Sequence, residues 1–162
     1  MCCLFHPPLR LLVLSAVLYI VSPATGGTSN SLMDISADGL VLACSNRDSG
    51  TVSIIDLRTH AKICEILVGN KPEGVSFLGS THRLAVAVYG TDQVVFLDAD
   101  ADADQTLATT RVFDEPYGIV SNESGSRVYV TLDFPGRVLE IDTSSLKIKR
   151  EFEVGEFIRG IA

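Results

Sequence analysis

Tryptophan is absent from this chain of 162 residues, and only four cysteines occur. Two of them, Cys2 and Cys3, lie at the N-terminus, which leaves Cys44 and Cys64 for the rest of the chain, too few for a disulfide framework. Basic residues are also few, since 13 lysines and arginines stand against 20 acids and give a net charge of −7. Without a basic cluster the chain lacks the footprint of a nucleic-acid binder, and we expect no nucleic-acid partner.

Several patterns that indicate chemistry are missing as well. The sequence has no Gly-x-Ser-x-Gly elbow, no glycine-rich phosphate loop and no C-x-x-C-H haem attachment motif. His60 and His82 are single histidines in predicted turns, with no paired ligand in the sequence. After residue 25, no segment keeps a 3.6-residue apolar period for three helical turns, which argues against helices. We therefore predict no cofactor and an all-β chain.

The N-terminus has the three parts of a secretory signal peptide. Arg10 is followed by an apolar run over residues 11–22, and small residues precede a cleavage site after Ala24. The run is shorter than the roughly 20 residues that span a bilayer. We expect residues 1–24 to be removed, leaving no membrane span and a product in the periplasm, at the cell surface or outside the cell; an uncleaved anchor is the alternative. Residues 25–31 are predicted to be a Gly/Ser/Thr linker.

A short motif recurs along the remaining chain: a turn residue, a β-rich apolar run and an aspartate. The motif ends at Asp56, Asp98 and Asp142, at spacings of 42 and 44 residues. At an offset of 86 residues the first and third units align without a gap, and several glycines and acids coincide. The matched pairs are Gly39 and Gly125, Gly50 and Gly136, Glu65 and Glu151, Gly69 and Gly155, and Gly74 and Gly160. A period of this length is the signature of a repeat architecture.

Each unit contains four short β-rich runs separated by turn residues. In the first unit we predict strands near Leu32–Ser36, Leu40–Ser45, Gly50–Asp56 and Lys62–Val68. The second strands of the next two units are predicted near Arg83–Val88 and Arg127–Leu132. Runs such as residues 94–97 are apolar at successive positions, which is typical of a sheet buried on both faces. Four strands in each repeat predict a β-propeller, with a flat sandwich as the alternative. The predicted blades cover residues 32–73, 74–117 and 118–160, and residues 161–162 begin a fourth.

The third unit resembles a known repeat. It contains Arg127-Val128-Tyr129-Val130-Thr131, then Gly136-x-Val138 and Ile141-Asp142, and is similar to the YVTN-family β-propeller repeat. That family is related to the WD-repeat and quinoprotein amine dehydrogenase-like propellers, and the resemblance covers residues 31–162. Leu132 departs from the motif, which has Asn there, and the middle unit lacks the Asp-Gly turn. Because propellers close with four to eight blades, three blades imply an incomplete ring, truncated or split, with closure by self-association as the alternative.

In propellers of this kind, the loop from the fourth strand to the next first strand lies on the top face, over the central channel. The resemblance assigns residues 69–74, 113–118 and 155–160 to these loops. The residue before the closing glycine is Glu73, Tyr117 and Arg159 in turn. An acid, a phenol and a guanidinium at equivalent points could bind a polar ligand, and solvated loop residues are the alternative.

Other candidate residues favour structural roles. The repeated Asp56, Asp98 and Asp142 are expected to cap the turn after the third strand. Asp100, Asp102 and Asp104 are spaced as in a calcium loop, but the run lacks the glycine and glutamate of that motif, so we expect a solvated acidic loop, with a weak metal site as the alternative. The two cysteines outside the N-terminus fall on strands separated by another strand, about 9–10 Å apart, and are expected to be free, buried thiols.

The sequence thus predicts an exported propeller that serves as a binding or scaffold module. Its expected partner is a protein or a small polar ligand at the channel mouth, or the remaining blades of the ring. The resemblance also implies an alternative, the N-terminal part of a propeller enzyme such as a haem- or quinone-dependent oxidoreductase or a lactonase. Such enzymes use histidine or arginine on the top face, where this chain offers only Arg159. We expect no catalysis by this chain alone.

Overall fold

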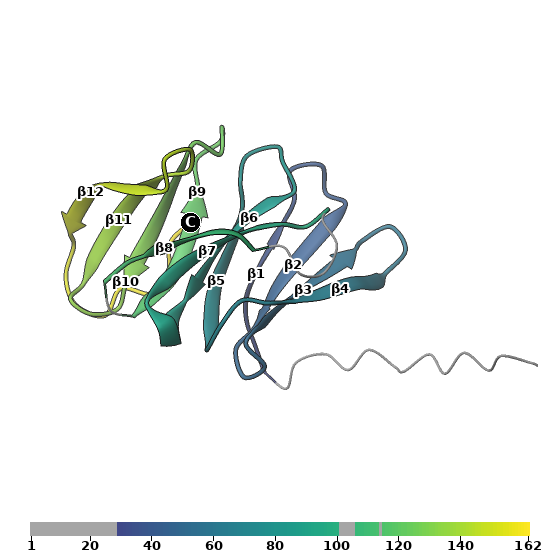
Figure 1. Cartoon of the computed structure of the whole chain (residues 1–162), viewed down its shortest axis with the longest axis horizontal. Helices are drawn as coiled ribbons and strands as arrows, with labels where there is room; N and C mark the ends of the chain where they lie inside the picture. The colour runs from purple at the N-terminus through teal and green to yellow at the C-terminus, as the bar shows by residue number, and fades with distance from the viewer. Residues whose placement is uncertain (1–28, 101–105, 114) are drawn as a thin grey trace, which may run out of the picture.

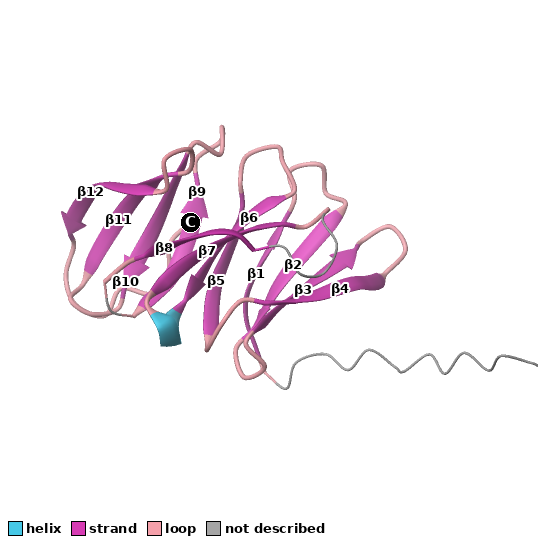
Figure 2. Ribbon diagram, viewed as in Figure 1, coloured by secondary structure: helices cyan, strands magenta, loops and turns pink. Residues whose placement is uncertain are grey.

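The computed structural model describes residues 29–100, 106–113 and 115–162. The predicted signal peptide and most of the predicted linker lie outside the described residues, as do Asp102 and Asp104. The described chain forms twelve strands and one short 3-10 helix (Figures 1 and 2). These are β1 (Asn30–Ile35), β2 (Val41–Asn46), β3 (Thr51–Asp56), β4 (Ala61–Leu67), β5 (Pro72–Phe77), β6 (Arg83–Val88), η1 (Tyr89–Thr91), β7 (Gln93–Asp98), β8 (Thr106–Arg111), β9 (Pro116–Ser121), β10 (Arg127–Leu132), β11 (Arg137–Asp142) and β12 (Lys147–Glu153).

The strands pair into three separate antiparallel sheets of four. In each sheet the strands follow chain order, so blade 1 is β1–β4, blade 2 is β5–β8 and blade 3 is β9–β12. The innermost strands lie side by side, with β5 between β1 and β9. Figure 1 shows the three blades in succession along the molecule. This arrangement confirms the predicted all-β propeller with an incomplete ring.

Turn residues set the strand ends much as the sequence predicts. Gly39, Gly50, Gly125 and Gly136 all have φ between 69° and 75°, a left-handed conformation that glycine adopts without a Cβ clash. Strands β6 and β10 have the predicted bounds. Strand β1 begins at Asn30, two residues earlier than predicted, so the last residues of the predicted linker belong to the first blade.

Blade 2 is buried on both faces, because its strands alternate apolar side chains between two cores. Val95 and Leu97 pack with blade 1, whereas Val94 and Phe96 pack with blade 3. All four are at most 4% exposed. Blades 1 and 3 are each covered on one face by described residues, so the expectation of double burial is correct only for the middle blade.

The open face of blade 3 carries a cluster of charged side chains. Its centre is Glu140, 4% exposed, whose carboxylate accepts hydrogen bonds from Arg127 Nε at 3.2 Å and Arg150 Nε at 2.8 Å. The 86-residue register places these three residues where blade 1 has Val41, Ile54 and Cys64. Blade 1 turns those apolar residues toward blade 2, and blade 3 instead has an ion-pair cluster at the same positions.

A glycine near the start of the innermost strands β5 and β9 lets neighbouring blades approach closely. A Cβ on Gly74 would lie 2.5 Å from the Tyr117 carbonyl oxygen, and one on Gly118 would collide with the Arg159 carbonyl. Gly160 holds the same position in the register but has nothing within 4 Å of its Cβ position. The glycines therefore recur because backbone from the next blade occupies the space of a side chain.

Candidate ligand site at the top face

We call the end of the blades at which Glu73, Tyr117 and Arg159 lie the top face. Glu73 is the second residue of β5 and is 2% exposed. Its carboxylate accepts hydrogen bonds from Arg47 Nε, at 2.5 Å, and from the Ser31 hydroxyl. Both donors come from blade 1, so Glu73 joins blade 2 to blade 1 and is not a solvated loop residue.

Arg159 occupies the corresponding position after blade 3. Its Nη2 and Nε donate to Oδ2 of Asp133 at 2.8 and 3.0 Å, and its backbone oxygen accepts from the Thr131 hydroxyl at 3.1 Å. The Arg159 side chain is 58% exposed, whereas that of Asp133 is 5% exposed. The hydrogen bonds from Arg159 to Asp133 raise the pKa of the guanidinium further. Arg159 is thus anchored through one edge and open to solvent on the other.

Tyr117, the second residue of β9, lies between these two pairs. Its ring stands perpendicular to that of Tyr89, with centroids 6.5 Å apart, and the Arg159 guanidinium lies 5.2 Å from its centroid. A hydrogen bond with Glu115 raises the pKa of the Tyr89 hydroxyl. Tyr117 and Arg159 are therefore in direct contact, whereas the Glu73 carboxylate is engaged by blade 1.

The partners of the predicted residues follow the same register, and sequence analysis missed them. Arg47, Tyr89 and Asp133 each come directly after the second strand of a blade. Each contacts the second residue of the next innermost strand, or its counterpart after blade 3. The offset of 86 residues that relates Glu73 to Arg159 also relates Arg47 to Asp133, so the repeat contained the signal.

One atom of this cluster has an unmet hydrogen-bonding requirement. Both hydrogen bonds from Arg159 go to Asp133 Oδ2. The other oxygen, Asp133 Oδ1, is buried and has no hydrogen-bond partner among the described residues. A buried carboxylate oxygen without a donor is unfavourable by about 1–3 kcal/mol or more. The site therefore combines an acceptor that lacks a donor, an exposed guanidinium and two aromatic rings.

The repeated aspartates lie where the third strand meets its turn. Asp56 Oδ1 accepts from the backbone N–H groups of Arg58 and Thr59, at 2.8 and 3.0 Å. Asp142 Oδ1 accepts from the Ser144 hydroxyl and from the Ser145 N–H, and these bonds hold the Asp142 pKa below its usual range. Asp98 accepts from the Asp100 N–H at 3.1 Å, and the rest of its turn, residues 101–105, lies outside the described residues.

His82 lies between a carboxylate of the acidic run, in its own blade, and a carboxylate of blade 1. His82 binds Asp100 Oδ1 through Nδ1 at 2.7 Å and Asp38 Oδ2 through Nε2 at 3.0 Å. The sequence predicts a single turn histidine without a partner, and this prediction is wrong. His82 binds two carboxylates, one from each of two neighbouring blades. Among the described residues no group of three or more His, Cys, Asp or Glu side chains is arranged to hold a metal ion, and Asp102 and Asp104 lie outside them.

Cys44 and Cys64 are both free thiols. Cys44 is buried, and burial raises the pKa of its thiol. Cys64 is only partly buried, which corrects the prediction, because it lies on β4, the outermost strand of blade 1.

Within the described ranges, no helix is long and apolar enough to cross a membrane.

Comparison with known proteins adds support for the fold. No family model matches the chain, and no curated protein sequence does either. Among solved structures, hydrazine synthase of Kuenenia stuttgartiensis is similar with a TM-score of 0.71 and 24% identity, over 77% of this chain and 36% of that one. A chain of the mitotic checkpoint complex is similar with a TM-score of 0.66 and 17% identity, over 74% of this chain and 35% of that one. The chain spans about a third of the length of these structures, and at these identities the likeness concerns the fold alone.

Proposed function

We propose that this chain is an exported β-propeller module that binds a polar ligand, or a polar group of a protein partner, at its top face. The observation that carries the proposal is the buried Asp133 Oδ1, which lacks a donor beside the exposed edge of Arg159. A ligand group that donates one hydrogen bond and accepts another, such as an amide, matches this pair. The rings of Tyr89 and Tyr117, at right angles to each other, offer apolar contacts next to it.

A protein is the partner that we favour for the complete molecule. One similar solved structure is a multi-protein complex, and ligand sites commonly lie in the mouths of β-barrel-like folds. The signal-peptide pattern in residues 1–24 supports export. Further blades that complete the ring are part of the proposal, because the chain spans only about a third of the similar structures.

The ligand proposal is tested by thermal shift with free amino acids, simple amides and sugars as probes. An amide-bearing probe is expected to raise the Tm of the full chain, and Asp133→Asn and Tyr117→Ala are expected to abolish the rise. Asp98→Asn, at the other end of the blades, is the matched control and should leave the rise unchanged. If no probe raises the Tm, or if the rise survives both top-face substitutions, the top face is not the ligand site.

Export and the enzyme alternative each have a direct measurement. N-terminal sequencing of the secreted product should begin at Thr25 if residues 1–24 are removed. An absorbance spectrum of the purified protein distinguishes a bare binding module from a haem- or quinone-dependent oxidoreductase. Visible absorbance that co-purifies with the chain would favour the enzyme.

A further inference from the structure

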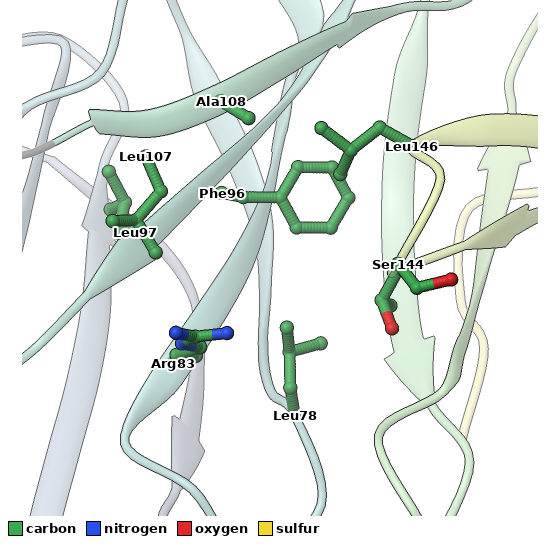
Figure 3. A pocket seen from close by; sticks show the side chains of 9 residues that line it. Leu78, Arg83, Phe96, Leu97, Leu107, Ala108, Ser144 and Leu146 are labelled. Atoms are coloured by element: carbon green, nitrogen blue, oxygen red, sulfur yellow. The ribbon is translucent and has the colours of Figure 1, made fainter.

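A second candidate surface lies between blades 2 and 3, away from the top face. A cleft of about 230 Å³ opens there, lined mainly by apolar side chains. Figure 3 shows the Phe96 ring of β7 directed toward Leu146, with Leu78 below it and Ala108 of β8 above. Ser144 supplies a polar group at one side.

The repeat explains why this junction has a cleft. Between blades 1 and 2 the equivalent space holds Val41 and Cys64, which pack against other core residues. The register replaces Val41 with Arg83, whose side chain is 62% exposed, and Cys64 with the smaller Ala108. The cleft is thus the volume that these two side chains fill one blade earlier.

The cleft borders a sheet edge that is unusually free of charge. Strand β8 is the outermost strand of blade 2, and its one charged residue is Arg111 at its end. The other outermost strands, β4 and β12, carry lysine and glutamate side chains along their length. Charged residues along an edge strand discourage pairing with another chain. The edge of β8 lacks this protection.

The backbone of β8 presents hydrogen-bonding groups outward at alternate residues. The Val112 N–H donates to the Asp92 carbonyl at 2.9 Å, and Thr110 lies opposite Val94, so both face β7. Alternation along an antiparallel strand turns the N–H and C=O of Thr109 to the outside. The Thr109 side chain is exposed as well.

We propose that the β8 edge and the adjoining cleft bind an extended segment of a protein partner, which adds to blade 2 as a fifth strand. Main-chain hydrogen bonds hold such a segment, and alternate side chains give it specificity. One aliphatic or aromatic side chain of the segment enters the cleft beside Phe96 and Leu146. This surface is separate from the proposed top-face site and shares no residue with it.

An extended peptide fits this surface better than a second copy of the chain. Stable interfaces between two folded proteins bury roughly 1,200–2,000 Å². Pairing β8 with the β8 of another copy joins only six residues of each strand, which is too little contact for a stable dimer. A peptide strand depends instead on the backbone groups of the edge and on one anchoring pocket. Both are present here.

The test uses a phage-displayed library of short random peptides, selected on the full chain. Selected sequences are expected to alternate, with a leucine, isoleucine, methionine or phenylalanine as anchor. Thr109→Pro should weaken a selected peptide by more than about tenfold, or about 1.4 kcal/mol, because proline removes the outward N–H. The fold should tolerate it, since proline is accepted on edge strands where the N–H faces solvent.

Two variants control for side-chain loss and for the pocket. Thr109→Val keeps the N–H and should bind like the unchanged chain, and Ala108→Leu fills the cleft and should weaken binding as Thr109→Pro does. Asp133→Asn, at the top face, should leave peptide binding unchanged. Failure to select any peptide, or binding that survives both Thr109→Pro and Ala108→Leu, would overturn the proposal. Sedimentation showing a dimer that Thr109→Pro dissociates would also overturn it, in favour of a second copy.

Discussion

Arg159 binds Asp133 through two hydrogen bonds, at 2.8 and 3.0 Å, and this contact repeats with exchanged charges the one between Arg47 and Glu73. In both cases the residue after a second strand meets the second residue of the next innermost strand or, after blade 3, its counterpart in the register. At the junction between them the same two positions hold Tyr89 and Tyr117. The fold therefore requires a contact at this place and leaves its chemistry open, which allows the top face to vary while the blades stay joined.

A double-mutant cycle on Arg47 and Glu73 measures how strongly this contact joins the blades. Arg47→Ala leaves Glu73 buried without its charge partner and should lower the free energy of unfolding by about 3 kcal/mol. Glu73→Ala should cost less, about 2 kcal/mol, because Arg47 is 39% exposed and can be solvated. The double variant should be at least about 1 kcal/mol more stable than the sum of the singles implies.

Urea denaturation followed by circular dichroism gives these free energies. The matched control is the more exposed pair of Arg137 and Glu151, in which Arg137 Nη1 lies 3.0 Å from Glu151 Oε2. Its coupling should be under about 0.5 kcal/mol, as for other surface pairs. Equal coupling in the two cycles would mean that the buried pair has no special role in joining blades.

Gly74→Ala should destabilise the chain through a backbone collision. The new Cβ would lie 2.5 Å from the Tyr117 carbonyl oxygen and 2.9 Å from the Ile119 nitrogen, and neither atom can move without shifting β9. Overpacking of this kind costs about 1–3 kcal/mol. Gly160→Ala is the control from the same place in the repeat, with open space around it, and should change the free energy of unfolding by less than about 0.5 kcal/mol. If Gly160→Ala lowered the free energy of unfolding more than Gly74→Ala, backbone crowding would not explain the glycine in β5.

The strands and the order of the blades could be predicted from the sequence because turn residues mark every strand. The bounds of β6 and β10 were predicted correctly, and Asp56, Asp98 and Asp142 all end third strands. Such signals are local in the chain, so they can be read without knowing which blades meet.

Contacts between blades were harder to predict. Asp38 and Asp100, which His82 joins, are 62 residues apart and belong to different blades. The partners of Glu73 and Arg159 likewise depend on which turn lies beside which strand. The strand pattern predicts apolar side chains on both faces and so gives no sign of the charge cluster around Glu140. The arginines that pair with this acid come from the neighbouring strands β10 and β12.

His82 predicts a stability that falls as the pH rises above neutrality. The hydrogen bonds to Asp100 and then to Asp38 raise the His82 pKa above its usual value, so the folded state binds a proton more tightly than the unfolded state. This contribution is fully present below about pH 6.5, the unfolded pKa, and is lost as the pH rises through the folded pKa. Asp98 and Arg83 also border this site.

The measurement is the Tm of the full chain between pH 5.5 and 8.5, compared with His82→Gln. The unchanged chain should lose more Tm across this range than the variant, because glutamine does not titrate. At low pH the contact depends on the ionisation of its partner, Asp38. Hydrogen bonds from Ser36 and the Leu40 N–H lower the Asp38 pKa to about 2 in the folded state. The contribution of this carboxylate to stability is therefore fully present above about pH 3.9, the unfolded pKa, and is lost as the pH falls through the folded pKa. Identical pH profiles for the two proteins would rule out His82 as the titrating group.

The last prediction ranks the repeated aspartates by their hydrogen bonds. Asp142→Ala should lower the Tm more than Asp56→Ala, because Asp142 accepts from Ser144 and Ser145 and pairs with Arg127, whereas Asp56 accepts two backbone hydrogen bonds and pairs with the exposed Arg58. If the role is structural, the Asp142 variant should still bind a top-face probe at temperatures below its Tm. Binding lost at full stability would instead make Asp142 part of a ligand site. Since Asp142 lies at the end of β11, opposite the first residue of β10 and away from the turn that holds Asp133, we expect the structural result.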